Sequence, residues 1–213
     1  MEGEGDVIEK SIKLSDITGV SIAGSSRLYI KQGDIQKITI KAQANIIDLL
    51  NREVKNGEWS AFFTKCIKTK ETVEIFVEVP QINSLGVQGS GTILSKEYLN
   101  VGEMELEIAG SGQINVKLNA EEIESEINGS GGVNLEGKTK SIEVEINGSG
   151  DVSAAQMIAE EAEVEINGSG DVRLNVTNSM DVEINGSGDV SYKGSPKNIK
   201  TDINGSGDLN KLD

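Results

Sequence analysis

The chain has 213 residues, enough for one domain or two small ones, and its net charge at pH 7 is −15. This surplus of carboxylates disfavours nucleic acid as a partner, because phosphate contacts need a basic face. Aromatic residues make up only 3% of the chain, which excludes a large aromatic core. Cys66 is the single cysteine, so an internal disulfide is excluded. Because the chain has no histidine to act as its base, we expect the thiol to be structural or incidental.

Residues 1–85 alternate between polar and apolar side chains in short stretches, without a fixed repeat. The stretches that predict strands are Ser11–Leu14, Arg27–Lys31, Lys37–Lys41 and Thr72–Val79. Residues 45–50 predict a short helical turn with Asn45 as its cap, and Asn56-Gly57 predicts a hairpin before residues 59–63. We expect this region to form a β-rich cap and the first coils, because an open solenoid end would template edge pairing.

Residues 86–213 are built on a repeat of about 19 residues. The tripeptide Gly-Ser-Gly begins at Gly89, Gly110, Gly129, Gly148, Gly168, Gly186 and Gly205, and a degenerate copy is predicted at 23–26. Five copies read Ile-Asn-Gly-Ser-Gly, and four of these continue with aspartate and an aliphatic residue. Such a period indicates a parallel solenoid, but Asn-Gly is also the strongest signal of an antiparallel hairpin.

The alternation of apolar and polar residues favours the solenoid. From Glu143 to Ser153, alternate positions are Val, Ile, Gly, Gly and Val, and this period of two passes through the glycines without a break. An extended strand with one polar face has this pattern, and the glycines then mark a bend. Near-identical coils stacked about 4.8 Å apart would place like residues above one another. The sequence therefore predicts an all-β, single-stranded parallel β-helix that is one continuous unit over residues 86–213.

Two inward columns of aliphatic side chains are expected to hold the coils together. The first column is Ile108, Ile127, Ile146, Ile166, Ile184 and Ile203. The second column is Ile93, Ile114, Val133, Val152, Val172, Val190 and Leu209. The sequence contains no obvious C-terminal cap, so the C-terminal edge is predicted to be a short charged edge or a contact in a homo-oligomer.

The residues also resemble a known family. The repeated Ile-Asn-Gly-Ser-Gly-Asp-Val, the opening segments 17–24 and 28–33, and residues 77–80 before 85–91 resemble the auto-transporter adhesin family with a "head GIN" domain. The resemblance covers nearly the whole chain and implies a right-handed β-helix similar in shape to pectin lyases. It also implies an exported or lipid-anchored protein. We therefore expect an extracellular or periplasmic, surface-anchored protein, although the chain contains no signal peptide and no apolar run of transmembrane length.

The polar residues beside the glycines predict a regular outward strip. Its members are Asn128, Asn147, Asn167, Asn185, Asn204, Ser149, Ser169, Ser187, Asp151, Asp171, Asp189 and Asp208. Donors and acceptors that repeat every 4.8 Å or so suit a repetitive ligand, such as a glycan or a peptide strand. Asparagine ladders also hydrogen-bond to one another. A structural role is therefore the favoured alternative for the asparagines and serines, and an equal alternative for the aspartates.

A second outward column is acidic, and consists of Glu107, Glu126, Glu145, Glu165, Glu183 and Asp202. Like charges opposite one another on neighbouring strands are destabilising, so counterions, lysines or calcium are expected to offset them. Calcium takes six to eight oxygens, and the spacing of the acids differs from that of the calcium-binding β-roll repeat. No metal or other cofactor is therefore assigned.

Three functions follow from these patterns. The main hypothesis is a non-catalytic cell-surface binding or adhesion module for a glycan or a protein, with no nucleic acid as partner and no membrane insertion. The first alternative is a polysaccharide-active enzyme of the pectin lyase type. Its one distinctive residue is Arg173, in line with Asn134 and Ser153, but acids that repeat in every coil do not form a single constellation, so no catalytic residue is assigned. The second alternative is a structural β-helix that self-assembles end to end.

Overall fold

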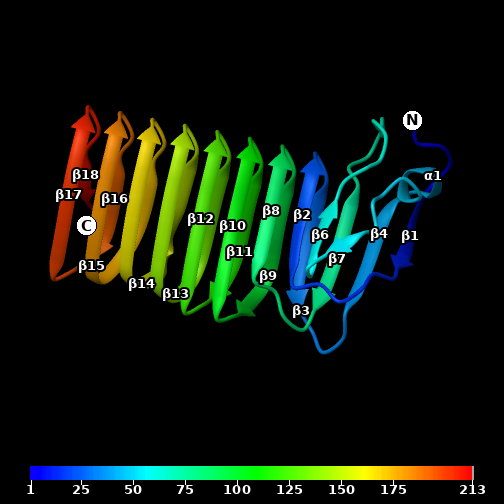
Figure 1. The fold of residues 1–213 in the computed structure, drawn as a ribbon, viewed down its shortest axis with the longest axis horizontal. Coiled ribbons are helices and arrows are strands. Elements are labelled where there is room, and N and C mark those ends of the chain that lie inside the picture. Colours follow the sequence, from blue (N-terminus) through cyan, green and yellow to red (C-terminus); the bar gives the residue numbers. More distant parts are fainter. Residues whose placement is uncertain (213) are drawn as a thin grey trace.

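The structure, a computed structural model that describes residues 1–212, is an elongated stack of flat coils (Figure 1). A complete coil has an A strand, which ends at the first glycine of a Gly-Ser-Gly triplet, and a B strand, which follows the triplet. In each of β13, β14 and β15 one long strand contains the B segment of one coil and the A segment of the next. In chain order the elements are β1 (Val7–Ile12), β2 (Gly19–Gly24), β3 (Arg27–Gln32), β4 (Lys37–Gln43), α1 (Ala44–Ile47), β5 (Val54–Lys55), β6 (Glu58–Ala61), β7 (Glu74–Val79), β8 (Ser84–Gly89), β9 (Thr92–Asn100), β10 (Glu103–Gly110), β11 (Gln113–Asn119), β12 (Glu122–Gly129), β13 (Gly132–Gly148), β14 (Asp151–Gly168), β15 (Val172–Gly186), β16 (Val190–Gly194), β17 (Asn198–Gly205) and β18 (Leu209–Lys211).

The coils stack in parallel and in register, which confirms the predicted β-helix. A segments pair with A segments and B segments with B segments, so the coils form an A sheet and a B sheet. Glycine lies opposite glycine in each pair of neighbouring coils, for example Gly129 opposite Gly148 and Gly148 opposite Gly168. The antiparallel meander, the competing interpretation of Asn-Gly, is therefore wrong for the repeat.

The N-terminal region contributes both a coil and the covered end of the solenoid. Strands β2 and β3 form a coil of their own, because β2 lies between β6 and β8 and β3 lies between β7 and β9 (Figure 1). Gly24 pairs with Gly89, so the degenerate copy at 23–26 is a true corner. Beyond this coil, β4 runs antiparallel to β7, and β1 runs antiparallel to β4. These antiparallel strands give β7 a neighbour at the end of the B sheet.

Three of the four strands predicted before residue 80 lie close to their predicted ranges, as β3, β4 and β7, whereas the first strand is β1 and lies earlier, at Val7–Ile12. The Asn56-Gly57 hairpin is confirmed, since β5 and β6 pair antiparallel. The helical turn exists as α1, but Asn45 as its cap is wrong. Gln43 occupies the N-cap position without a side-chain hydrogen bond. The Asn45 amide instead binds the N-terminal segment, accepting from the Glu4 N–H at 3.1 Å and donating to the Glu2 carbonyl at 2.8 Å.

Both predicted aliphatic columns point inward and form the core. Ile146 and Val172 have no exposed surface, and neither do most members of the two columns. Each fully buried side chain of this size contributes roughly 1.5–3 kcal/mol. Ile203 and Leu209 are only partly buried, because they belong to the last coil, which has a described neighbour on one side alone.

The core contains one polar irregularity. Ser125 occupies an inward position between Leu106 and Val144 of the neighbouring coils, and its buried hydroxyl has no hydrogen-bond partner among the described residues. A buried hydroxyl without a partner costs about 1–3 kcal/mol.

Ser125→Val is therefore expected to raise the free energy of unfolding by about 1–2 kcal/mol in a urea titration. Ser130→Val, at an exposed position of the next corner, should leave stability nearly unchanged. Equal or lower stability of Ser125→Val would contradict the prediction.

The triplet needs glycine at its first and third positions because adjacent coils approach closely there. The first glycine has a positive φ in every copy, for example +147° at Gly168. A Cβ on Gly168 would lie 2.0 Å from the carbonyl oxygen of Gly148, and a Cβ on Gly170 would lie 2.1 Å from that of Gly150. The Gly148 carbonyl cannot easily move away, since it accepts the Ser169 N–H at 2.8 Å.

Candidate functional site: a polar corner ridge

The predicted polar strip lies at the corner where A strands pass into B strands, and we call it the corner ridge. It consists of Asn128, Asn147, Asn167, Asn185, Asn204, Ser130, Ser149, Ser169, Ser187, Ser206, Asp151, Asp171, Asp189 and Asp208. The equivalent residues are stacked coil over coil by the parallel register. The three residue types differ in how much of their hydrogen-bonding capacity the fold itself uses.

The asparagines form a hydrogen-bonded ladder along the ridge. Nδ2 of Asn167 donates to Oδ1 of Asn147 at 3.2 Å, Asn185 donates to Asn167 at 3.2 Å, and Asn204 donates to Asn185 at 3.3 Å. Three of the five asparagines are half-buried. The ladder uses the amides to join the coils, so these side chains stabilise the stack.

The same asparagines offset the repulsion within the acidic column. Asn147 donates to Glu145 at 2.7 Å, Asn167 to Glu165 at 2.8 Å, and Asn185 to Glu183 at 2.9 Å. Each carboxylate lies two residues before its asparagine, on the same outward side of the strand. The repeated Glu-Ile-Asn was the sequence signal for this pairing, and the sequence interpretation, which considered counterions, lysines and calcium, missed it.

The aspartates bind backbone amides of the next coil. Oδ1 of Asp151 accepts the Asp171 N–H at 3.1 Å, Oδ1 of Asp171 accepts the Asp189 N–H at 3.2 Å, and Oδ1 of Asp189 accepts the Asp208 N–H at 2.9 Å. One oxygen of each of these carboxylates therefore satisfies a backbone donor of the fold. The second oxygen of Asp171 lies 3.9 Å from the Arg173 guanidinium.

The serines are the part of the ridge that the fold uses least. Their backbone N–H groups donate to the glycine carbonyl of the preceding coil, at 2.8 Å for Ser149, Ser169 and Ser187. Their side chains are exposed in every coil of the ridge, and their hydroxyls make no hydrogen bond to another described residue. The corner ridge therefore carries a row of exposed serine hydroxyls, one in each coil, that make no hydrogen bond to another described residue.

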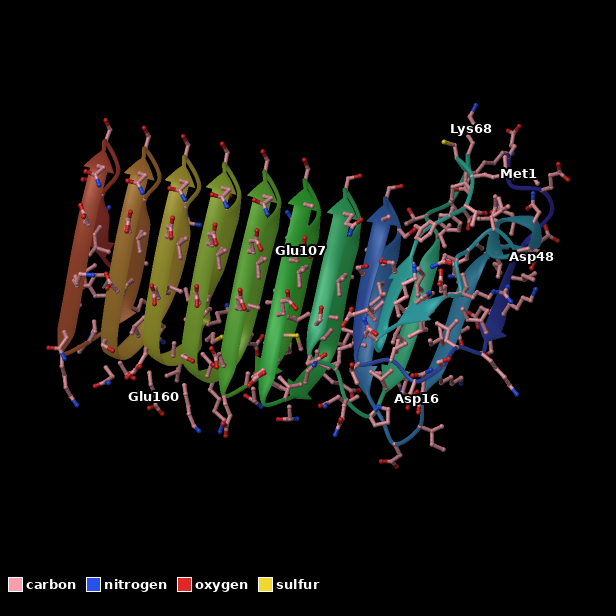
Figure 2. All side chains as sticks on the ribbon, in the orientation of Figure 1. Met1, Asp16, Asp48, Lys68, Glu107 and Glu160 are labelled. Atoms are coloured by element: carbon pink, nitrogen blue, oxygen red, sulfur yellow. The ribbon has the colours of Figure 1, made fainter. Side chains whose placement is uncertain are left out.

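The outward face of the A sheet is strongly acidic. Besides the predicted column that begins at Glu107, a parallel column contains Glu105, Glu124, Glu143, Glu163 and Asp181. Figure 2 shows Glu107 in the middle of this face, with oxygen-tipped side chains in rows on either side. The pKa of Glu143 is raised, mainly by partial burial of its carboxyl group and to a smaller extent by the negative charges of Glu163, Glu124, Glu122 and Glu145. Burial and Glu105 raise the pKa of Glu58 at the covered end of the face.

These two glutamates bind protons more tightly in the folded state, so their ionisation lowers stability as the pH rises above about 4.5. Glu74 and Glu136 behave oppositely, because hydrogen bonds from Lys41 and from Tyr98, respectively, are the main causes that lower their pKa. Their stabilising contribution is present at neutral pH and is lost as the pH falls below about 4.5. In melting curves recorded across this range, we expect Tm to rise slightly as the pH falls from 7 towards the raised pKa values of Glu143 and Glu58, and to fall below about pH 4.

Neutralising the acidic column that begins at Glu105 tests the repulsion between its carboxylates directly. Glu124→Gln/Glu143→Gln/Glu163→Gln is expected to raise Tm by about 3–6 °C in low salt. The increase should shrink in 1 M NaCl, where the Debye length is only about 3 Å. The matched control is Glu71→Gln/Glu97→Gln/Glu160→Gln, which removes the same charge at scattered exposed sites. If both triple variants gave the same increase, the acidic column would have no special contribution.

The residues considered for catalysis do not converge. Arg173 lies in register with Ser153 and Ser191 on the outer B face and is exposed. Within residues 1–212 its one ion pair is the long contact to Asp171. Cys66 is exposed. No cluster of three or more histidine, cysteine, aspartate or glutamate side chains within residues 1–212 is arranged to hold a metal ion.

No helix among residues 1–212 is both long and apolar enough to cross a bilayer.

Stacked, in-register coils with glycine corners define the class of this protein, a parallel β-helix. Residues 16–196 match the model of the family described as "Putative auto-transporter adhesin, head GIN domain", and the chain belongs to that family. This confirms the resemblance seen in the sequence. No functionally curated protein matches the chain.

Solved structures share the fold over the whole length. A "putative adhesin" from Bacteroides fragilis has a TM-score of 0.93 at 22% identity and covers 100% of both chains. A "putative adhesin" from Parabacteroides distasonis has a TM-score of 0.78 at 21% identity, with 99% of each chain covered. A "putative lipid binding protein" from the same organism has a TM-score of 0.77 at 26% identity, with 100% of this chain and 99% of that chain covered.

Proposed function

We propose that this protein is a non-catalytic binding module of the cell surface, and that it holds an extended glycan along the corner ridge. The observation that carries the proposal is the row of exposed serine hydroxyls without partners in the described chain, with an aspartate two residues after the serine in four of the coils. Sugar hydroxyls both donate and accept hydrogen bonds, so serine hydroxyls and aspartate oxygens are complementary to them.

Membership of an adhesin family supports a binding role at the surface. The net charge of −15 favours an uncharged glycan over an acidic one, because long-range repulsion opposes a polyanion. A lipid, which the name of one similar structure mentions, suits the fold less well. Acyl chains need an apolar cavity, and the space between the A and B sheets is occupied by the aliphatic columns.

The test is binding of uncharged oligosaccharides on a glycan array, followed by titration calorimetry. Ser149→Ala/Ser169→Ala/Ser187→Ala should weaken binding of the selected glycan by about tenfold, since three hydroxyl contacts of modest strength are lost. Ser15→Ala/Ser195→Ala changes exposed serines outside the ridge and should bind as the unmodified protein does. Full affinity of the triple variant, or no glycan bound by the unmodified protein, would reject the ridge as the binding site.

A further inference from the structure

A groove of about 420 Å³ crosses the outer face of the B sheet near its covered end. Its floor includes a row of side chains in register on four adjacent strands. The row is Thr39 on β4, Phe76 on β7, Tyr29 on β3 and Leu94 on β9. Thr39 is small and the next three side chains are large and mainly apolar, so the floor steps up onto a mainly apolar platform.

Two aromatic rings form the centre of this platform. Tyr29 and Phe76 are stacked with their ring centroids 5.0 Å apart and their planes 10° from parallel. Tyr29 covers one face of Phe76, while the strand on the other side of Phe76 carries only Thr39 at that level. Phe76 is 36% exposed. In a chain with so few aromatic residues, an exposed stacked pair on an outer sheet face is not needed to fill the core.

The charged residues along the groove are balanced. Lys31 and Glu78 form an ion pair of 2.9 Å. The remaining charged lining residues are Glu9, Lys37, Lys96 and Glu97, which are exposed and make no ion pair within residues 1–212. The Lys96 ammonium lies over the Tyr29 ring, 5.8 Å from its centroid. These two ammonium groups and two carboxylates still present both donors and acceptors to a ligand. No net charge of one sign is left to select an ion.

The groove continues along the solenoid. A second hollow of about 370 Å³ also has Leu94 in its lining and extends over the next three coils. The floor row continues there as Asn115, Asn134 and Ser153. The Asn134 amide donates to Asn115 at 2.6 Å. Together the two hollows make an elongated track with an aromatic end and an amide and hydroxyl extension.

We propose that this B-sheet groove binds a glycan, with one uncharged pyranose ring against the face of Phe76 that Tyr29 leaves open and the following units over Asn115 and Asn134. The C–H face of a pyranose is apolar and flat, and it packs against an aromatic ring that carries a negative π face. Its ring hydroxyls find donors in Lys37 and Lys96 and acceptors in Glu9 and Glu97. An acyl chain suits the groove less well, because it would bury the four flanking charged side chains, which have no ion-pair partner within residues 1–212, and such burial is costly. The proposal takes its ligand class from the proposed function and places the sugar on a different surface.

The experiment uses the full chain and the uncharged oligosaccharide selected on the array. Phe76→Thr keeps a residue with strand propensity and removes the ring, and it is expected to weaken binding by about tenfold or more in titration calorimetry. Saturation transfer from the protein to the sugar C–H protons should weaken in this variant.

Phe62→Thr is the matched control, because Phe62 is 41% exposed and lies outside the groove. Circular dichroism melting confirms that each variant is folded, and Leu94→Glu is a second variant of the platform should Phe76→Thr not fold. Loss of binding in Phe76→Thr but not in Phe62→Thr supports the groove. Loss only in the triple serine variant overturns the groove and leaves the proposed function intact. If the unmodified protein binds no oligosaccharide, both proposals are overturned. If it binds phosphatidylcholine vesicles and this binding is lost in Phe76→Thr, the glycan is overturned as the occupant of the groove.

Discussion

Ile146→Asp is expected to abolish the folded state of the coils around it. Ile146 has no exposed surface and stacks between Ile127 and Ile166 in the inward column. The substitution removes the packing of a buried isoleucine and places a carboxylate among mainly aliphatic side chains. Together these effects cost about 4 kcal/mol or more, a large part of the stability of a typical domain.

Circular dichroism and limited proteolysis measure the effect. We expect a strong loss of β signal at 25 °C and cleavage within residues 120–212, since coils that contact only their neighbours lose a partner on both sides. Ile158→Asp is the control, because Ile158 is also in β14 but is 53% exposed. A normal melting curve for Ile146→Asp would show that the column is not the core of the stack.

Gly168→Ala is expected to destabilise the protein by about 3 kcal/mol or more, although it adds only one methyl group. Two effects combine at this position. The positive φ of +147° disfavours any L side chain, and the new Cβ would meet the Gly148 carbonyl oxygen at 2.0 Å. Relief would require the two coils to separate and to lose the hydrogen bond from Ser169 to that carbonyl.

Two other glycines separate these effects in urea titrations. Gly24 has φ of +84° but open space around its Cβ position, so Gly24→Ala should cost only about 1 kcal/mol. Gly102 has open space and no positive φ, so Gly102→Ala should be nearly neutral or slightly stabilising. If Gly168→Ala cost no more than Gly24→Ala, close approach between coils would not explain the glycines of the repeat.

The repeated half could be predicted from the sequence because its structure depends on local pattern. The unbroken alternation from Glu143 to Ser153 assigned both faces of the strands, and a constant period assigned each residue its partner in the next coil. The inward columns and the outward strip follow from these two facts alone. The hydrogen bonds within the strip were harder to predict, because the asparagines and aspartates had both a structural and a binding role available to them.

The N-terminal half was less predictable because its pairings are not periodic. Strand β2 pairs with β8, so Gly24 meets Gly89, which lies 65 positions later in the chain. Nothing local in residues 34–83 indicates that the chain leaves the solenoid, covers its end and returns to the other side of its first coil. The B-sheet groove arises from that excursion, since β4, β7, β3 and β9 are adjacent in space but not in sequence. Its aromatic residues appear in the sequence only as outward positions of two separate strands.

The two described ends of the chain lie at opposite ends of the stack (Figure 1), and the hydrogen bonds between coils run along the line that joins them. A pull on both ends would therefore peel coils from the exposed end one after another. Each released coil of about 19 residues would lengthen the molecule by roughly 60 Å. A tethered protein of this design would yield to tension in small, repeated steps and would dissipate mechanical load while its remaining coils stayed folded.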